Sequence, residues 1–421
     1  MTQAELESEA ERLASSPFGL GRRLRAPLVP GARPRWVAEA QPPPVALASP
    51  RASARDLGGW LADELSVRHD PERGAGWRLA ATRDVDGSTV VALTLNHLFG
   101  TGRDIAATLY GGEQVISPEN GATSAAPLSD LADQFRDCGA RLRRGTIGTL
   151  RLARDAALFP VRRPHHGDLV DIGRPIAALR DRDRSRGRPS QRRVGATVRA
   201  AHHEFDAAAA RHGGTRTTLQ LAASANLLRE ARRTRGTPAE RPIRLIVPVD
   251  LADRRAVPKA SATVGPVMLT SATVVLPGGR PRYGDLAEVR EELRRAIQRA
   301  VAEVEATGRV PVAPGVVDAM RLLPDAVSSR VMFGVHAHYD GAVSNVGPLP
   351  PGIMRIGEHV ATDAFLMAFP LGSDLAIGFA THDDVLAIGA VADPSRLGAG
   401  PPLRERIAAE LERWGISSTA W

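Results

Sequence analysis

A polar segment over 161–193 divides this chain and constrains its fold more than any other feature of the sequence. It reads VRRPHHGDLVDIGRPIAALRDRDRSRGRPSQRR and has no apolar periodicity, which is typical of a linker. Strand-like and helix-like stretches lie on both sides of it. A chain of 421 residues is also too long for one ordinary core. We therefore predict an N-terminal lobe over 1–160, a crossover linker over 161–193 and a C-terminal lobe over 194–421.

The N-terminal half mixes helical and strand patterns. The predicted elements are a helix over 56–66, two strands over 77–84 and 88–95 joined by the turn VDGS, and a long helix over 128–159. We expect Gly139 and Gly145 to break or bend the long helix and Pro160 to end it.

The C-terminal half has a similar mixture of predicted strands and helices. Its predicted elements are a strand from Val194 running into a helix that ends at Arg211, a helix over 217–234, strands over 241–251 and 267–277, a helix over 283–306, strands over 363–373 and 374–391, and a helix over 403–415. Because the two halves have similar mixtures of strands and helices, we predict two related lobes.

The charge of the chain narrows the classes of partner. The net charge is +8, but Lys259 is the only lysine, and many of the arginines alternate with aspartate. The aromatic residues do not interleave with the basic stretches as base-stacking platforms would. We therefore expect no nucleic-acid binding. A basic surface suits an acidic protein partner or a phosphate-bearing cosubstrate.

Cysteine and histidine content argues against a metal site. Cys138 is the only cysteine, so an internal disulfide is excluded, and we expect a small, inert, buried side chain there. The pairs His165-His166 and His202-His203 have no third ligand at a convincing spacing. The sequence also has no apolar run of about 18 residues and no signal-like start. We expect a soluble, cytoplasmic protein without a transmembrane segment.

One histidine lies at the end of a predicted buried strand. In LTLNHLFGTG, His97 follows an apolar run and precedes the turn glycines Gly100 and Gly102. Scaffolds often display working side chains at such strand ends. His97 is therefore either a catalytic base at the mouth of a pocket or an ordinary strand-end histidine.

The order of the elements resembles the chloramphenicol acetyltransferase-like superfamily, in particular its branch of nonribosomal-peptide condensation domains, polyketide-associated acyltransferases and wax ester synthase/diacylglycerol acyltransferases. The resemblance covers roughly Asp56 to Trp421. Its carriers, in order, are HDPERGAGWRLAATRDVDGSTVVALTLNHLFGTG, RHGGTRTTLQLAASANLL, IRLIVPVDL and SNVGPLP. It implies an α/β fold of two lobes, each a mixed sheet with helices, and a tunnel between the lobes.

The HHxxxDG motif of that superfamily falls on Asn96 to Gly102. The resemblance makes His97 the general base and Gly102 the turn glycine. Asn96 replaces a mainly structural histidine and can still form hydrogen bonds. Thr101 replaces the aspartate that braces the loop, and Asp104 is the nearest candidate for a substitute carboxylate.

The resemblance also implies a chemistry that one histidine can perform. A neutral imidazole takes the proton from a hydroxyl or amine as it attacks a thioester carbonyl, and then protonates the thiol. The Asn345 side chain and the backbone around Gly347 are candidate donors to the oxyanion, although Ser344-Asn345 also suits a strand-ending turn. His336 and His338, with Ser344, are candidates for a tunnel wall; a solvent-facing edge is the alternative.

We therefore predict an acyltransferase or condensation-type enzyme that forms an ester or amide in specialised or lipid metabolism. The expected partners are an acyl-CoA or an acyl-carrier protein and a small-molecule acceptor. No bound cofactor is expected, because the CoA or phosphopantetheine thioester is a cosubstrate. Two alternatives stay open: a catalytically degenerate relative that binds an acylated carrier or partner enzyme, and a catalyst of cyclisation or elimination on the same fold.

Overall fold

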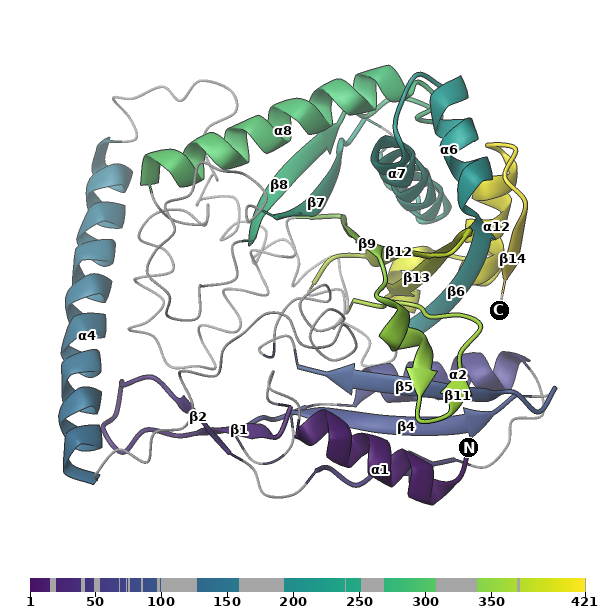
Figure 1. Cartoon of the computed structure of the whole chain (residues 1–421). Coiled ribbons are helices and arrows are strands. Elements are labelled where there is room, and N and C mark those ends of the chain that lie inside the picture. Colours follow the sequence, from purple (N-terminus) through teal and green to yellow (C-terminus); the bar gives the residue numbers. More distant parts are fainter. Residues whose placement is uncertain are drawn as a thin grey trace.

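Two sheets form the framework of the chain, one of seven strands and one of three, with helix α2 between them (Figure 1). The structure is a computed structural model. It describes residues 1–15, 20–38, 42–48, 54–96 except 68, 73, 75 and 85, residue 99, 127–158, 193–250 except 239, 269–307, 339–368 and 372–420.

The three-stranded sheet belongs to the N-terminal part of the chain. The elements of this part are α1 (Gln3–Ala14), β1 (Arg22–Arg25), β2 (Arg35–Ala38), β3 (Ala46–Leu47), α2 (Ala54–Ser66), β4 (Trp77–Arg83), β5 (Thr89–Leu95) and α4 (Pro127–Leu158). Strands β4 and β5 pair antiparallel, and β3 adds to β4 in parallel. Because side chains alternate along a strand, β4 and β5 bury two faces. Leu79 packs on the α1 side and Ala80 on the α2 side.

The seven-stranded sheet has the order β14-β6-β13-β12-β9-β7-β8 and mixes parallel with antiparallel pairs. The elements of this part are β6 (Val194–Ala201), α6 (His202–Arg211), α7 (Arg216–Thr234), β7 (Ile243–Asp250), β8 (Leu269–Leu276), α8 (Leu286–Thr307), β9 (Gly341–Pro348), η2 (Pro351–Met354), β10 (Arg355–Ile356), β11 (His359–Val360), β12 (Leu375–His382), β13 (Val385–Ala392), α11 (Pro394–Leu397), α12 (Leu403–Glu412) and β14 (Ser418–Ala420). One face of the sheet packs against α6, α7, α8 and α12 to form the main core.

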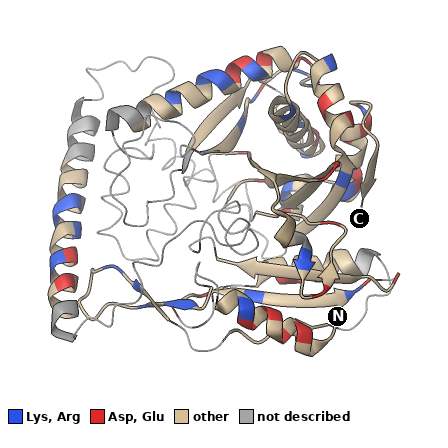
Figure 2. Cartoon of the chain, viewed as in Figure 1, with Lys and Arg blue, Asp and Glu red and all other residues tan. Residues whose placement is uncertain are grey.

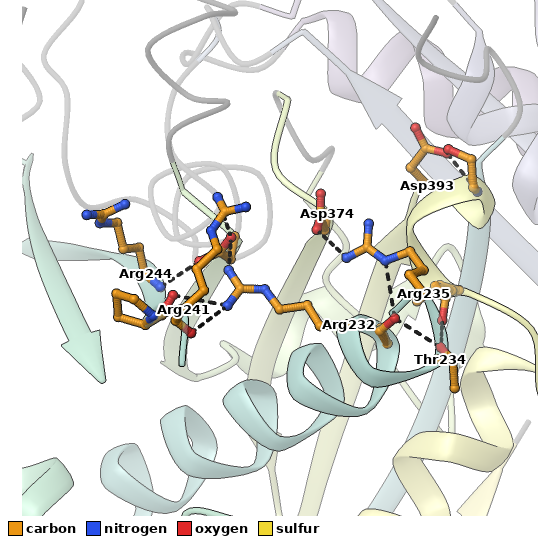
Figure 3. Close-up of polar contacts among 12 residues, drawn as sticks. Arg232, Thr234, Arg235, Arg241, Arg244, Asp374 and Asp393 are labelled. Atoms are coloured by element: carbon orange, nitrogen blue, oxygen red, sulfur yellow. Dashed lines mark hydrogen bonds and ion pairs between the residues drawn. The ribbon is translucent and has the colours of Figure 1, made fainter. Parts of the chain in front are cut away.

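Buried ion pairs fix the edge of the large sheet at which β9 and β12 begin (Figure 3). Asp340 directly precedes β9 and is 3% exposed. Its carboxylate pairs with Arg232 of α7 and accepts a hydrogen bond from the Arg244 backbone N–H at 2.8 Å. Arg235 pairs with Asp374, which directly precedes β12, at 3.1 Å. The C-terminal end of α7 is thereby tied to the first residues of both strands.

A segment over 363–368 crosses the other face of the large sheet, where we expected a strand over 363–373. Ideal Cβ atoms built on Gly378 and Gly389 would lie 2.6 Å and 2.3 Å from the Leu366 carbonyl oxygen. The two glycines therefore let the backbone of this segment lie directly on β12 and β13. The prediction of a strand was wrong because these apolar residues pack across the sheet instead of pairing along its edge.

The structure corrects two further predictions. The predicted long helix exists as α4, but it runs through Gly139 and Gly145 without a break. The apolar stretch 374–391 forms two strands, β12 and β13, because Asp383 takes a positive φ of 47° and turns the chain. The predicted strands at β4, β5, β6, β7 and β8 and the helices at α2, α6, α7, α8 and α12 are confirmed.

Most of the described arginines on the α8 surface lie beside carboxylates. Figure 2 shows acidic and basic residues next to each other along this helix. The Glu291 carboxylate accepts hydrogen bonds from Arg294 and Arg295, at 2.9 Å and 2.8 Å, and the Glu292 carboxylate accepts one from Arg299 at 3.0 Å. The excess of arginine therefore creates little unbalanced charge here. Among the described helices, none combines the length and the apolar character needed to cross a bilayer.

Candidate functional site

The candidate site begins at the C-terminal end of β5, where the chain leaves the small sheet. Asn96 donates its backbone N–H to the Gly76 carbonyl at 2.8 Å, and its own carbonyl accepts from the Phe99 N–H at 3.1 Å. Phe99 is 8% exposed and lies against Trp36, with ring centroids 5.0 Å apart. The backbone is thus anchored on both sides of His97, which itself lies outside the described residues.

A second histidine clamps the end of β5. The Nε2 atom of His69 lies 3.0 Å from Thr94 Oγ1, and the His69 carbonyl accepts a hydrogen bond from the Asn96 side-chain amide at 3.2 Å. Thr94 and Asn96 are two residues apart, so their side chains point to the same side of the strand. His69 therefore bridges Thr94 and Asn96, which lie three residues and one residue before the predicted base.

The surroundings of His69 favour a neutral imidazole. Burial, and then the positive charge of Arg78, lower its pKa below the ordinary value. Arg78 lies on β4 opposite Thr94 and is held by Glu64 of α2, with 3.0 Å between Arg78 Nε and Glu64 Oε2. A neutral ring can accept or donate a hydrogen bond at Nε2, so it suits a partner that is a hydroxyl.

His69 has no predicted role, although it lies in the stretch that carries the family resemblance. The signal in the sequence is weak, because His69 follows α2 in a loop and its partner Thr94 is 25 residues further along. Only the folded chain brings the two together.

The second part of the candidate site lies on β9. Its pairing with β12 contains a bulge, since Phe379 faces Asn345 and the next residue, Ala380, faces Gly347. Gly347 has a φ of +74°, a conformation that favours glycine. The Asn345 side-chain oxygen accepts the Gly347 backbone N–H at 2.9 Å. Of the two predicted oxyanion donors, the Gly347 N–H is thus already engaged, whereas the N–H donors of the exposed Asn345 amide have no partner among the described residues.

Ser344 and Asn345 lie on opposite faces of the large sheet. Ser344 pairs with Gly378, on the face crossed by the 363–368 segment. On this same face Leu65 of α2 reaches the position of Gly195 in β6. Asn345 pairs with Phe379, which belongs to the core under the helices. The face of Ser344 is therefore the one turned towards the N-terminal part.

A further contact joins the N-terminal part to the segment that connects β9 with β12. His359 of β11 lies 3.0 Å from Glu5 of α1, through Nε2 and Oε1. The hydrogen bonds of Glu5 with the Thr2 backbone and with His359 lower the pKa of its carboxyl to about 2. The contact ties the first helix to the chain that leaves the large sheet.

Several predicted site residues lie outside the described residues, and their roles stay predictions. They are His97, Thr101, Gly102, Asp104, His336 and His338. The described members are Asn96, Ser344 and Asn345. Cys138 is half-buried rather than buried, and its thiol lies 3.4 Å from the Pro30 carbonyl oxygen.

Comparison with solved structures identifies the fold. The chain is similar to the wax ester synthase/diacylglycerol acyltransferase from Marinobacter aquaeolei VT8, with a TM-score of 0.55 and 14% identity over 97% of this chain and 88% of that one. Similarities with TM-scores below 0.5 include the first condensation domain of the CDA synthetase, at 0.48 and 16% identity over 98% and 86%, and the epimerization domain from the third module of tyrocidine synthetase B, at 0.45 and 12% identity over 98% and 87%.

At the level of sequence, no protein family and no curated protein matches this chain. The structural similarity nevertheless confirms the predicted resemblance at the level of fold: the chain shares the fold of the wax ester synthase/diacylglycerol acyltransferase. It also confirms the α/β class with a large mixed sheet covered by helices. The tunnel and the lobe boundaries stay predictions.

Proposed function

We propose that this chain is an acyltransferase that moves an acyl group from a CoA or carrier-protein thioester to the hydroxyl or amine of a small acceptor. The fold it shares with the wax ester synthase/diacylglycerol acyltransferase supports this reaction class by analogy. The observation that carries the proposal is the anchored end of β5. Asn96 is held there by Gly76 and His69, directly before the histidine on which the motif places the base.

In the proposed reaction, neutral His97 accepts the proton of the acceptor hydroxyl or amine as the oxygen or nitrogen attacks the thioester carbonyl. The new ester or amide bond forms as the carbon–sulfur bond breaks, and the proton passes from the imidazole to the leaving thiolate. Ser344, on the sheet face turned towards the N-terminal part, lines the proposed path of the substrates. Asn345 lies on the opposite face, so we assign it no contact with the oxyanion. The acyl donor leaves as a free thiol.

The release of thiol provides the test. The purified chain is incubated with acyl-CoAs of graded length and with acylated carrier proteins, together with alcohol or amine acceptors. Free thiol is followed with a colorimetric reagent and the product by mass spectrometry. We expect acceptor-dependent thiol release, and His97→Ala should lower kcat by about a hundredfold to ten-thousandfold.

The matched control is His203→Ala. His203 is exposed and pairs with Asp384 at the start of α6, so its removal should leave kcat unchanged. Tight binding of an acylated carrier without thiol release for any acceptor would contradict the proposal. That result would favour the degenerate binding protein, for which the replacement of the motif aspartate by Thr101 provides a reason.

A further inference from the structure

Helix α4 exposes a row of large apolar side chains. Phe135 is 62% exposed, Leu142 54%, Ile147 43% and Leu150 65%. At about 100° per residue, these four positions fall on one side of the helix and extend over about 22 Å. We call them the apolar stripe. Monomeric proteins rarely leave such a row on one helix uncovered.

The opposite side of α4 holds the helix to the rest of the chain. The Gln134 side-chain oxygen accepts the backbone N–H groups of Leu28 and Val29, at 2.7 Å and 3.0 Å, and Arg141 donates to the Ala32 carbonyl at 2.9 Å. Gln134 and Arg141 are seven residues apart and lie about half a turn away from the stripe. The stripe is therefore the side turned away from this attachment, and Figure 1 places α4 at the edge of the molecule.

The charges around the stripe are positive. Within 131–150 the only carboxylates are Asp133 and Asp137, and both are paired: Asp133 with Arg136 at 2.5 Å, Asp137 with Arg33 at 2.7 Å. Two arginines, Arg143 and Arg144, are exposed and form no ion pair within the described part of the chain. Arg143 stands within the stripe and Arg144 on its border. The exposed side of α4 thus combines apolar groups with uncompensated cations.

We propose that the exposed side of α4 binds an anionic lipid surface. A helix with Phe and Leu on one side and arginine beside them lies in a membrane interface with its apolar side chains among the acyl chains. Arginine contributes there because its stem packs on apolar groups while the guanidinium reaches the phosphates. A lipid surface also needs no shape complementarity, which suits a convex helix at the edge of a molecule.

A second copy of the chain fits this surface less well. Leu142 and Arg143 lie at the middle of the stripe, so a two-fold antiparallel pairing of two α4 helices would bring Arg143 close to Arg143 of the other copy. Like charges facing each other in a helix pair are destabilising. The proposal does not depend on acyl transfer, because it rests on α4 alone.

The test is co-sedimentation of the whole chain with lipid vesicles. Vesicles of phosphatidylcholine are compared with vesicles containing about a third phosphatidylglycerol, at low and high salt. We expect binding to the anionic vesicles that weakens with salt. Leu150→Glu should weaken it by about tenfold, because it removes one inserted apolar side chain and adds a like charge to the lipid. Arg143→Gln with Arg144→Gln should weaken binding to the anionic vesicles only.

Val360→Glu is the matched control, because Val360 is 64% exposed and lies on β11, far from α4 in the sequence. Circular dichroism verifies that all variants are folded. Equal binding by Leu150→Glu and Val360→Glu, or a wild-type chain that sediments with neither vesicle, would overturn the proposal. So would a wild-type dimer that Leu150→Glu dissociates without any change in vesicle binding. The proposal would also be overturned if the chain bound an acidic protein and Leu150→Glu abolished that binding while vesicle binding persisted.

Discussion

The imidazole of His69 is hydrogen-bonded to the hydroxyl of Thr94, at 3.0 Å between Nε2 and Oγ1, and this bond ties the loop after α2 to the last residues of β5. Thr94→Val removes the hydroxyl at almost constant volume. We expect it to lower kcat of the proposed transfer by about ten- to a hundredfold through a misplaced base, with KM little changed. Thr94→Ser keeps the bond and should retain activity. Equal loss in both variants would mean that the bond does not position the site.

The lowered pKa of His69 predicts a pH dependence. Burial and Arg78 hold the folded pKa below the ordinary value of 6.5, so the unfolded chain binds more protons between the two values. Stability from the neutral ring is therefore complete above about pH 6.5 and is lost as the pH falls through the folded pKa. An NMR titration of the His69 ring should show this lowered pKa. His69→Gln, which offers a donor at a similar position, should flatten the pH dependence of the free energy of unfolding in this range. An unchanged pH dependence would show that His69 is not its source.

Asp340 should be a large contributor to stability. Its buried carboxylate pairs with Arg232 and accepts the Arg244 N–H, so Asp340→Ala leaves a buried guanidinium without its anion. We expect the free energy of unfolding to fall by about 3–5 kcal/mol, measured in urea. Glu288→Ala removes an exposed pair with Arg280 and should cost at most about 1 kcal/mol. If both variants lost a similar free energy of unfolding, Asp340 would not be the large contributor to stability expected here.

The glycine at 389 tests the segment that crosses the large sheet. A Cβ on Gly389 would lie 2.3 Å from the Leu366 carbonyl oxygen, so Gly389→Ala must displace either the segment or the strand. We expect a loss of about 1–3 kcal/mol in thermal or urea unfolding. Gly58→Ala, in α2 where a Cβ meets nothing within 4 Å, should instead stabilise by about 0.5–1 kcal/mol. A neutral Gly389→Ala would show that the segment is not seated on the sheet.

Periodicity in the sequence predicts most of the strands and helices of the large sheet, because buried strands such as β7 and amphipathic helices such as α8 have strong local patterns. It fails where tertiary contacts decide. The apolar residues around Leu366 have the sequence pattern of a strand. They lie across the sheet instead, because Gly378 on β12 and Gly389 on β13 leave room for their backbone. His69 looks like an ordinary loop residue until Thr94 is brought to it. Neither relationship has a local signature.

The strand order also bears on how the chain is synthesised. In the finished sheet, β6 lies between β13 and β14, both of which the ribosome makes long after it. During translation β6 therefore has no strand partner, and its apolar residues, such as Val198, must be covered meanwhile by the helices α6 and α7 that follow it directly. Pairings between such distant segments close slowly. A ribosome-bound intermediate in which α6 and α7 shield β6 is the expected consequence of this topology.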